Sequence, residues 1–160
     1  MNGLHLTADL RDCAAPRNAL TDVDALRAAC LAAVEAVGLT PVGTLFHHFG
    51  GDGGATGVVL LAESHLAVHT WPELDAVTLD VYVCNFGVDN TPRAHALMDR
   101  LLAHFAPAQA NRHALHRGQP PRPQRVPGAA IATALAPATP VATAATATAT
   151  ATATTHGAAA

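Results

Sequence analysis

The sequence predicts an α+β fold, a two-layer α/β sandwich in which an antiparallel sheet carries two helices on one face. Several short stretches alternate apolar and polar residues, as half-buried strands do, and only two stretches show helical periodicity. The strands largely follow one another without an intervening helix, which favours antiparallel pairing. Because the second face of such a sheet is left to solvent or to another chain, we also expect a homodimer.

The first two elements are predicted by periodicity and by capping residues. Residues 3–11 alternate leucine or alanine with polar residues and predict a strand. A helix is expected over residues 22–37, where apolar residues recur along one side. Thr21 or Asp22 can cap its start, and Gly38 can end it.

The middle of the chain predicts four consecutive strands. They are separated by a glycine-rich loop and by a Pro-Glu-Leu-Asp turn, and they cover residues 40–49, 56–63, 64–71 and 76–84. The second helix is expected from Thr91, with Pro92 at its first position, to about Phe105. A last short strand is possible at 110–117. We therefore predict one domain over residues 1–117.

Beyond this domain the composition changes. Residues 118–160 begin with a proline-rich segment and continue as an Ala/Thr repeat without an apolar face. We interpret this segment as a disordered tail. Its Ala/Thr run is too weakly hydrophobic to predict a membrane span, and no membrane partner is expected.

Composition excludes several functions. Residues 1–106 contain five arginines against all twelve acids, a net charge of -7, so nucleic acid is not an expected partner. The chain has no lysine, which excludes pyridoxal phosphate (PLP), a cofactor held as a lysine Schiff base. Three cysteines outside any CxxC arrangement, and no visible signal peptide, favour a reduced, cytoplasmic protein.

The stretch AESHLAVHTWPE, residues 62–73, concentrates polar side chains in an apolar chain. Ser64 is not in a G-x-S-x-G motif, so a hydrolase nucleophile is disfavoured. His65 and His69 resemble a zinc-binding H-x-x-x-H, but on a strand they lie ~13 Å apart, too far to share one ion. No metal is expected, although a zinc-binding module stays open as an alternative.

A self-cleavage reaction fits these residues better. A serine hydroxyl can attack the preceding carbonyl, here that of Glu63, and convert the peptide bond into an ester. Removal of the serine Cα proton then eliminates the ester, and hydrolysis leaves a pyruvoyl group and ammonia. The reaction needs a nearby histidine and a hydroxyl, which His69 and Thr56 could supply to Ser64. The chemistry of these residues alone does not favour self-cleavage over the simpler interpretation, in which Ser64 is an ordinary polar residue at the end of a strand.

The segments GVVLLAESHLAVHTWPE and LDVYVC closely resemble the small prokaryotic S-adenosylmethionine decarboxylase proenzymes. GLHLTADLRDC resembles the opening strand of that family, and HALHRG extends the resemblance to the end of the predicted domain. The resemblance implies autocatalytic cleavage of a zymogen into a β fragment, 1–63, and an α fragment, 64–160. It also implies a pyruvoyl lyase that decarboxylates S-adenosylmethionine as a Schiff base and provides the aminopropyl donor for spermidine biosynthesis.

The same resemblance implies individual roles. Ser64 becomes the pyruvoyl group, His69 supports processing, and Cys84, twenty residues after the serine, reprotonates the substrate. Without the family spacing, a strand-end cysteine is more often a small buried hydrophobe. For the substrate, Glu73 would bind the ribose hydroxyls and Phe49 would stack on adenine.

Two features of the sequence bear on substrate specificity: the acids near the first strand and the positions at which this chain departs from the family. Asp9 or Asp12 stands where the family has acids near the cationic end of the substrate. The family usually has Ser-Gly where this chain has Thr56-Gly57, the glycine-rich loop is longer, and His48 replaces a frequent arginine. Two alternatives therefore stay open: the same chemistry on ornithine or arginine, and an unprocessed, non-enzymatic homologue.

Overall fold

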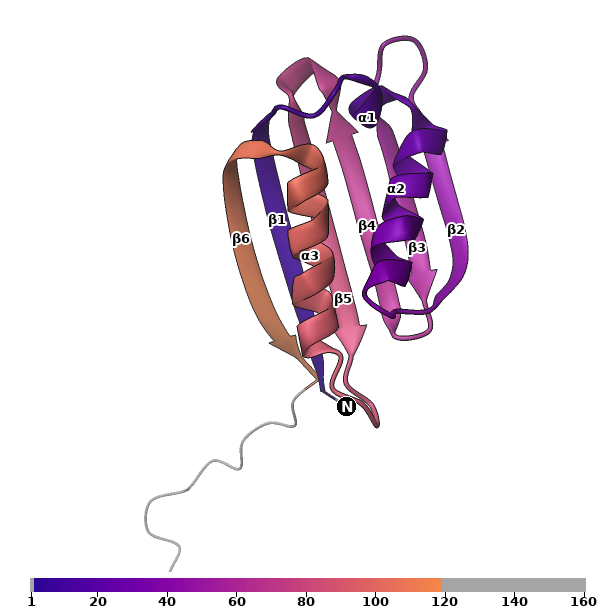
Figure 1. The fold of residues 1–160 in the computed structure, drawn as a ribbon, viewed down its shortest axis with the longest axis vertical. Coiled ribbons are helices and arrows are strands. Elements are labelled where there is room, and N and C mark those ends of the chain that lie inside the picture. The colour runs from indigo at the N-terminus through magenta and orange to yellow at the C-terminus, as the bar shows by residue number, and fades with distance from the viewer. Residues whose placement is uncertain (1, 119–160) are drawn as a thin grey trace, which may run out of the picture. The chain divides into compact units, whose positions relative to one another are not determined.

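The alternating strands form a single antiparallel sheet of six strands, which the computed structural model describes over residues 2–118 (Figure 1). The order across the sheet is β2-β3-β4-β5-β1-β6, so the first strand lies between the last two. The strands are β1 (Gly3–Cys13), β2 (Pro41–His48), β3 (Ala55–Leu61), β4 (Ser64–Trp71), β5 (Ala76–Cys84) and β6 (Pro107–Arg117). Each pairs antiparallel to its neighbours. The predicted fold class is confirmed.

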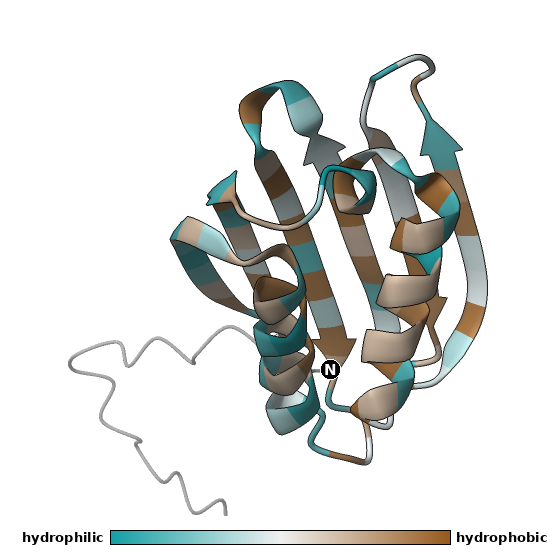
Figure 2. Cartoon of the chain, turned by 45° about the horizontal axis from the view of Figure 1, so that its top comes forward, coloured by the Kyte–Doolittle hydropathy of each residue, from teal (hydrophilic) through white to brown (hydrophobic). Residues whose placement is uncertain are grey.

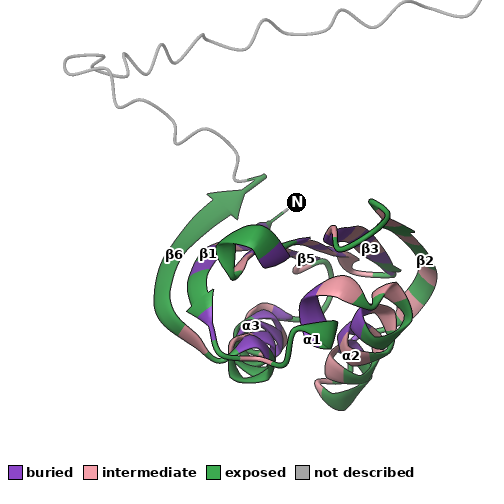
Figure 3. Ribbon diagram, turned by 90° about the horizontal axis from the view of Figure 1, so that it is seen from above, coloured by how far each residue is buried: buried purple, intermediate pink, exposed green. Residues whose placement is uncertain are grey.

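Two long helices cover one face of this sheet, as Figures 1 and 3 show. They are α2 (Val23–Ala36), next to β2 and β3, and α3 (Thr91–Phe105), next to β1 and β5. The carboxylate of Asp22 caps α2 by accepting the backbone N–H groups of Asp24 and Ala25, both at 3.0 Å. A one-turn helix that the periodicity did not predict, α1 (Asn18–Thr21), precedes it. The predicted Pro-Glu-Leu-Asp turn is largely a 3-10 turn, η1 (Pro72–Leu74).

The core lies between the helices and the sheet. Alternate strand residues point into it, which gives β1 and β5 the banded colouring of Figure 2. The helices contribute their apolar sides, and the largest fully buried side chains are Phe105, Leu10, Leu20, Leu26, Leu66, Leu79, Leu97, Met98 and Leu101. Burial of these side chains supplies the main driving force for folding.

The opposite side of the sheet, here called the open face, has no covering layer within residues 2–118 (Figure 3). It carries the other half of each alternation, including Leu60 of β3, Trp71 of β4 and Leu115 of β6, which are 44–52% exposed. These exposed apolar side chains alternate with polar ones along the strands of the open face.

Within residues 2–118, no helix is long and apolar enough to cross a membrane. From residue 119 on, the predicted tail lies outside the described residues.

Candidate active site

The Glu63–Ser64 bond lies where β3 turns into β4. Leu61 pairs with Ser64, so only Ala62 and Glu63 form the connection. The carboxylate of Glu63 accepts hydrogen bonds from the backbone N–H of Thr40 at 3.2 Å and from its hydroxyl at 3.3 Å. The carbonyl of Glu63 accepts the backbone N–H of Cys84 at 2.8 Å. Both the side chain and the carbonyl that precede Ser64 are therefore fixed in place.

Ser64 and Cys84 are brought together by the register of the sheet. Ser64 pairs with Val83, which places the end of β5 beside the Glu63–Ser64 connection. The hydroxyl oxygen of Ser64 lies 3.2 Å from Nδ1 of His65. Cys84 is partly exposed on the open face, as its place in the alternation of β5 requires.

The other two cysteines are unsuited to proton transfer. Cys13 and Cys30 are buried in the core. Burial raises the pKa of the Cys30 thiol to about 12, and burial, with the nearby carboxylates of Asp75 and Asp12, raises that of Cys13. Among the three thiols, only Cys84 is therefore available to a substrate.

His65 stands in a cluster of aromatic and charged side chains on the open face. Its ring lies 6.2 Å from the ring of His5 and 5.7 Å from that of Tyr82, measured between centroids. Nε2 of His5 lies 3.0 Å from the Asp80 carboxylate, and the guanidinium of Arg117 stacks on Tyr82 at 4.9 Å. Sequence analysis assigned none of these residues a role. The Ser64–His65 adjacency and the polar alternation of β1 and β5 were the available indications.

Thr56 and His69 form a second pair, but away from Ser64. The Thr56 hydroxyl lies 2.7 Å from Nδ1 of His69, across the β3–β4 ladder. His69 lies five positions after Ser64 on β4, which corresponds to about 17 Å along a strand. The structure therefore places the predicted site residues in two groups, which are Thr56 with His69, and Glu63 with Ser64 and Cys84. Within one chain these two groups lie far apart.

A pocket of about 510 Å³ joins Phe49, expected to stack on adenine, and Glu73, expected to bind the ribose hydroxyls. Trp71, which sequence analysis did not single out, lines the same pocket, together with the glycine-rich loop at Gly53 and Gly54. These residues lie at the His69 end of β4, again far from the Ser64 of the same chain.

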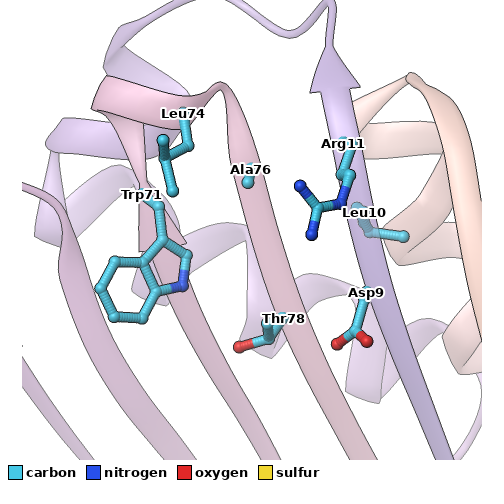
Figure 4. A pocket seen from close by; sticks show the side chains of 7 residues that line it. All are labelled: Asp9, Leu10, Arg11, Trp71, Leu74, Ala76 and Thr78. Carbon is cyan, nitrogen blue, oxygen red and sulfur yellow. The ribbon is translucent and has the colours of Figure 1, made fainter.

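Asp9 lines a neighbouring pocket of about 360 Å³ that shares Trp71 (Figure 4). Its carboxylate stands beside the side chains of Arg11 and Thr78 on the open face. Asp12, the alternative acid, instead accepts a hydrogen bond from the amide of Gln109 at 3.0 Å. The structure therefore favours Asp9 over Asp12 as a pocket residue.

Within residues 2–118, no three histidine, cysteine or acidic side chains gather in a group that could hold a metal ion.

Comparisons with known proteins identify the family of the chain. The sequence model of the S-adenosylmethionine decarboxylase family matches residues 4–118. The S-adenosylmethionine decarboxylase proenzyme of Aquifex aeolicus is 36% identical over 116 residues, which cover 72% of this chain and 81% of that protein. The proenzyme of Persephonella marina is 36% identical over 119 residues, 74% of this chain and 84% of that protein.

The fold agrees as well. The crystal structure of the adenosylmethionine decarboxylase from Aquifex aeolicus superposes with a TM-score of 0.66 at 33% identity, covering 75% of this chain and 93% of that one. The sequence match and the shared fold together show that this chain belongs to the S-adenosylmethionine decarboxylase family.

Proposed function

We propose that the chain is a proenzyme that cleaves itself between Glu63 and Ser64 and then decarboxylates S-adenosylmethionine. The observation that carries this proposal is the geometry of the turn. The Glu63 carbonyl accepts the N–H of Cys84, and the Ser64 hydroxyl at the start of β4 has a histidine within hydrogen-bond distance. An activated hydroxyl beside a polarised carbonyl is what an N-to-O acyl shift requires.

The residues around Ser64 fit a pyruvoyl group made from it. The chain has no lysine to hold PLP, and Ser64 is partly exposed at the start of β4, where a substrate can reach it. When formed, the pyruvoyl group supplies the electron sink for loss of the carboxylate. Cys84, the accessible thiol next to it, then delivers a proton to the substrate Cα.

Phe49, Glu73 and Asp9 provide the substrate contacts in this proposal. Phe49 stacks on adenine, an interaction worth roughly 1–3 kcal/mol. Glu73 accepts hydrogen bonds from the ribose hydroxyls, and the carboxylate of Asp9 attracts the cationic end of the substrate. The two pockets meet at Trp71, so one ligand can reach both.

The active enzyme is a homodimer that pairs through the open face. Roles for His69, Thr56, Phe49 and Glu73 require them near Ser64, yet about 17 Å of strand separates the two groups within one chain. A two-fold axis perpendicular to the strands turns one copy end for end relative to the other. His69 of the partner subunit can then reach Ser64, and the exposed leucines and Trp71 of the open face become buried.

Intact mass spectrometry of the purified protein tests the function. We expect two fragments divided between Glu63 and Ser64, the C-terminal one lighter by one ammonia than a hydrolytic fragment. The Ser64→Ala chain should stay whole, and only the cleaved protein should release CO₂ from S-adenosylmethionine, with ornithine and arginine as comparison substrates. A wild-type chain that stays intact would withdraw every role assigned to Ser64.

Co-expression of two uncleavable variants tests the shared site. Ser64→Ala chains and His69→Ala chains should each stay whole alone. In a mixed dimer, the His69→Ala chain keeps its own Ser64 and gains His69 of the partner subunit, so it should cleave. Absence of cleaved His69→Ala chain from confirmed mixed dimers would contradict the shared site.

A further inference from the structure

We propose that His65 is the base of the first self-cleavage step, taking the proton from the Ser64 hydroxyl as that oxygen attacks the Glu63 carbonyl. This inference rests on the proposed self-cleavage at the same bond. Nδ1 of His65 lies 3.2 Å from Oγ of Ser64, within the reach expected for a general base. In the same chain, His69 is about 17 Å away along β4 and is hydrogen-bonded to Thr56 instead.

The carbonyl under attack is prepared from its other side. The backbone N–H of Cys84 donates to the Glu63 oxygen at 2.8 Å, and a donor at this place stabilises the negative charge that develops on the oxygen during attack. Glu63 is anchored further by its two hydrogen bonds from Thr40. Base and oxyanion donor therefore converge on one peptide bond within a single chain.

The proton passes from the Ser64 hydroxyl to His65 and then to the Ser64 nitrogen. Neutral His65, protonated on Nε2, accepts the hydroxyl proton on Nδ1 while the Ser64 oxygen bonds to the Glu63 carbonyl carbon. The resulting imidazolium returns the proton to the Ser64 nitrogen as the carbon–nitrogen bond breaks. The products are an ester between Glu63 and the Ser64 oxygen and a free amine, with His65 regenerated. No external reactant enters.

The surroundings of His65 keep it available as a neutral base. Burial lowers the pKa of His65, the nearby His5 and Arg117 lower it further, and only the Asp80 carboxylate acts in the opposite direction. The carboxylate of Asp80 is already engaged by His5 at 3.0 Å. The ring of Tyr82 packs against both histidine rings, at centroid distances of 5.6 Å from His5 and 5.7 Å from His65.

The first test compares variants made by cell-free translation, with self-cleavage followed by intact mass against time. His65→Asn keeps an oxygen that can accept the Ser64 hydrogen bond but cannot carry the proton away. Loss of general-base catalysis should slow cleavage by about 10²–10⁴-fold, in His65→Asn and His65→Ala alike. His95→Gln, on the exposed side of α3, is the matched control and should cleave at the wild-type rate. A His65→Asn chain that cleaves as fast as wild type overturns the proposal.

Hydroxylamine separates the first step from the later ones, because it cleaves an ester at position 64 and leaves an ordinary peptide bond such as Glu63–Ser64 intact. Uncleaved His65→Asn chains should resist it, since their Glu63–Ser64 bond is still an amide. Uncleaved His65→Asn chains that hydroxylamine splits at this bond would have completed the acyl shift without His65, which also overturns the proposal.

The wild-type pH profile provides a test that no folding defect can obscure. The base must be neutral, so the cleavage rate should rise about tenfold per pH unit below the His65 pKa and level off above it. Because that pKa is lowered from 6.5, the rate should be half-maximal below pH 6.5. A wild-type rate that falls as the pH rises, or that is half-maximal only above pH 6.5, overturns the role of His65, whereas a wild-type chain that never cleaves overturns the proposed function itself.

Discussion

Thr70→Val tests how a single buried hydroxyl holds the substrate pocket to the core. Thr70 is 2% exposed, lies next to Trp71 at the end of β4, and lines the Phe49–Glu73 pocket. Its hydroxyl donates to the carbonyl of Leu20 at 2.6 Å and accepts the N–H of Ala55 at 2.8 Å. It thus ties α1, β3 and β4 together.

Valine has nearly the shape of threonine but leaves both of these backbone groups without their partner. An unsatisfied buried group costs about 1–3 kcal/mol, so the two together predict a loss of about 4 kcal/mol in the free energy of unfolding. Thr70→Ser keeps the hydroxyl and loses one methyl group, which predicts a loss of about 1 kcal/mol.

Urea titration followed by fluorescence of Trp71, the only tryptophan of the chain, measures both effects. The variants are made on a Ser64→Ala background, so that each protein is one uncut chain, and are compared at equal protein concentration. With a slope near about 2 kcal/mol/M, Thr70→Val should lower the urea midpoint by about 2 M. A midpoint for Thr70→Val equal to that of Thr70→Ser would refute the assignment of these two hydrogen bonds.

Three further predictions follow from the pockets and thiols. Gly54→Ala should lower stability by about 3 kcal/mol in the same titration, because a Cβ there would lie 2.0 Å from the backbone oxygen of Thr70; a stable Gly54→Ala protein would contradict this close approach. An aromatic disulfide reagent at neutral pH should label Cys84 rapidly and Cys30 only on unfolding, because burial raises the pKa of Cys30 to about 12. If a Cys84→Ala protein were still labelled rapidly, the reactive thiol would not be Cys84. Glu73→Gln should raise KM for S-adenosylmethionine about tenfold with kcat nearly unchanged in steady-state kinetics. A fall in kcat with KM unchanged would contradict a binding role and would mean that Glu73 takes part in the reaction itself.

Most of the fold could be predicted because the chain alternates apolar and polar residues so regularly. The strand predicted at 64–71 matches β4 to the residue, and the helix expected at 22–37 is α2 within one residue at each end. The helix α1 was missed, since four residues are too few to show a period. The prediction of the fold thus rested on the periodicity of apolar residues, because that periodicity shows which side of each helix or strand is buried.

The candidate site was harder to predict, because sequence distance is a poor guide to distance across a sheet. His69 is five residues from Ser64 in sequence but lies at the other end of the same strand. Cys84 is twenty residues from Ser64, yet its backbone N–H donates to the carbonyl of Glu63, the residue just before Ser64. His65 was weighed only as a metal ligand, because its contact with Ser64 depends on the local backbone at the start of β4 and not on any pattern. Strand register, which decides such meetings, is fixed only once the whole sheet has formed.

The strand order has a consequence for the cut protein. Fragment 1–63 supplies β2, β3 and β1, and the fragment beginning at Ser64 supplies β4, β5 and β6, so the two pieces alternate across the sheet in the order β2-β3, β4-β5, β1 and β6. The fragments are thus interleaved at three strand boundaries, and neither can leave without dismantling the shared core. Cleavage also turns refolding from a one-body into a two-body search, so the mature protein should persist by slow unfolding more than by reversible equilibrium. Folding must therefore be finished before the bond is cut, and an enzyme that has once lost its structure is not expected to recover it efficiently.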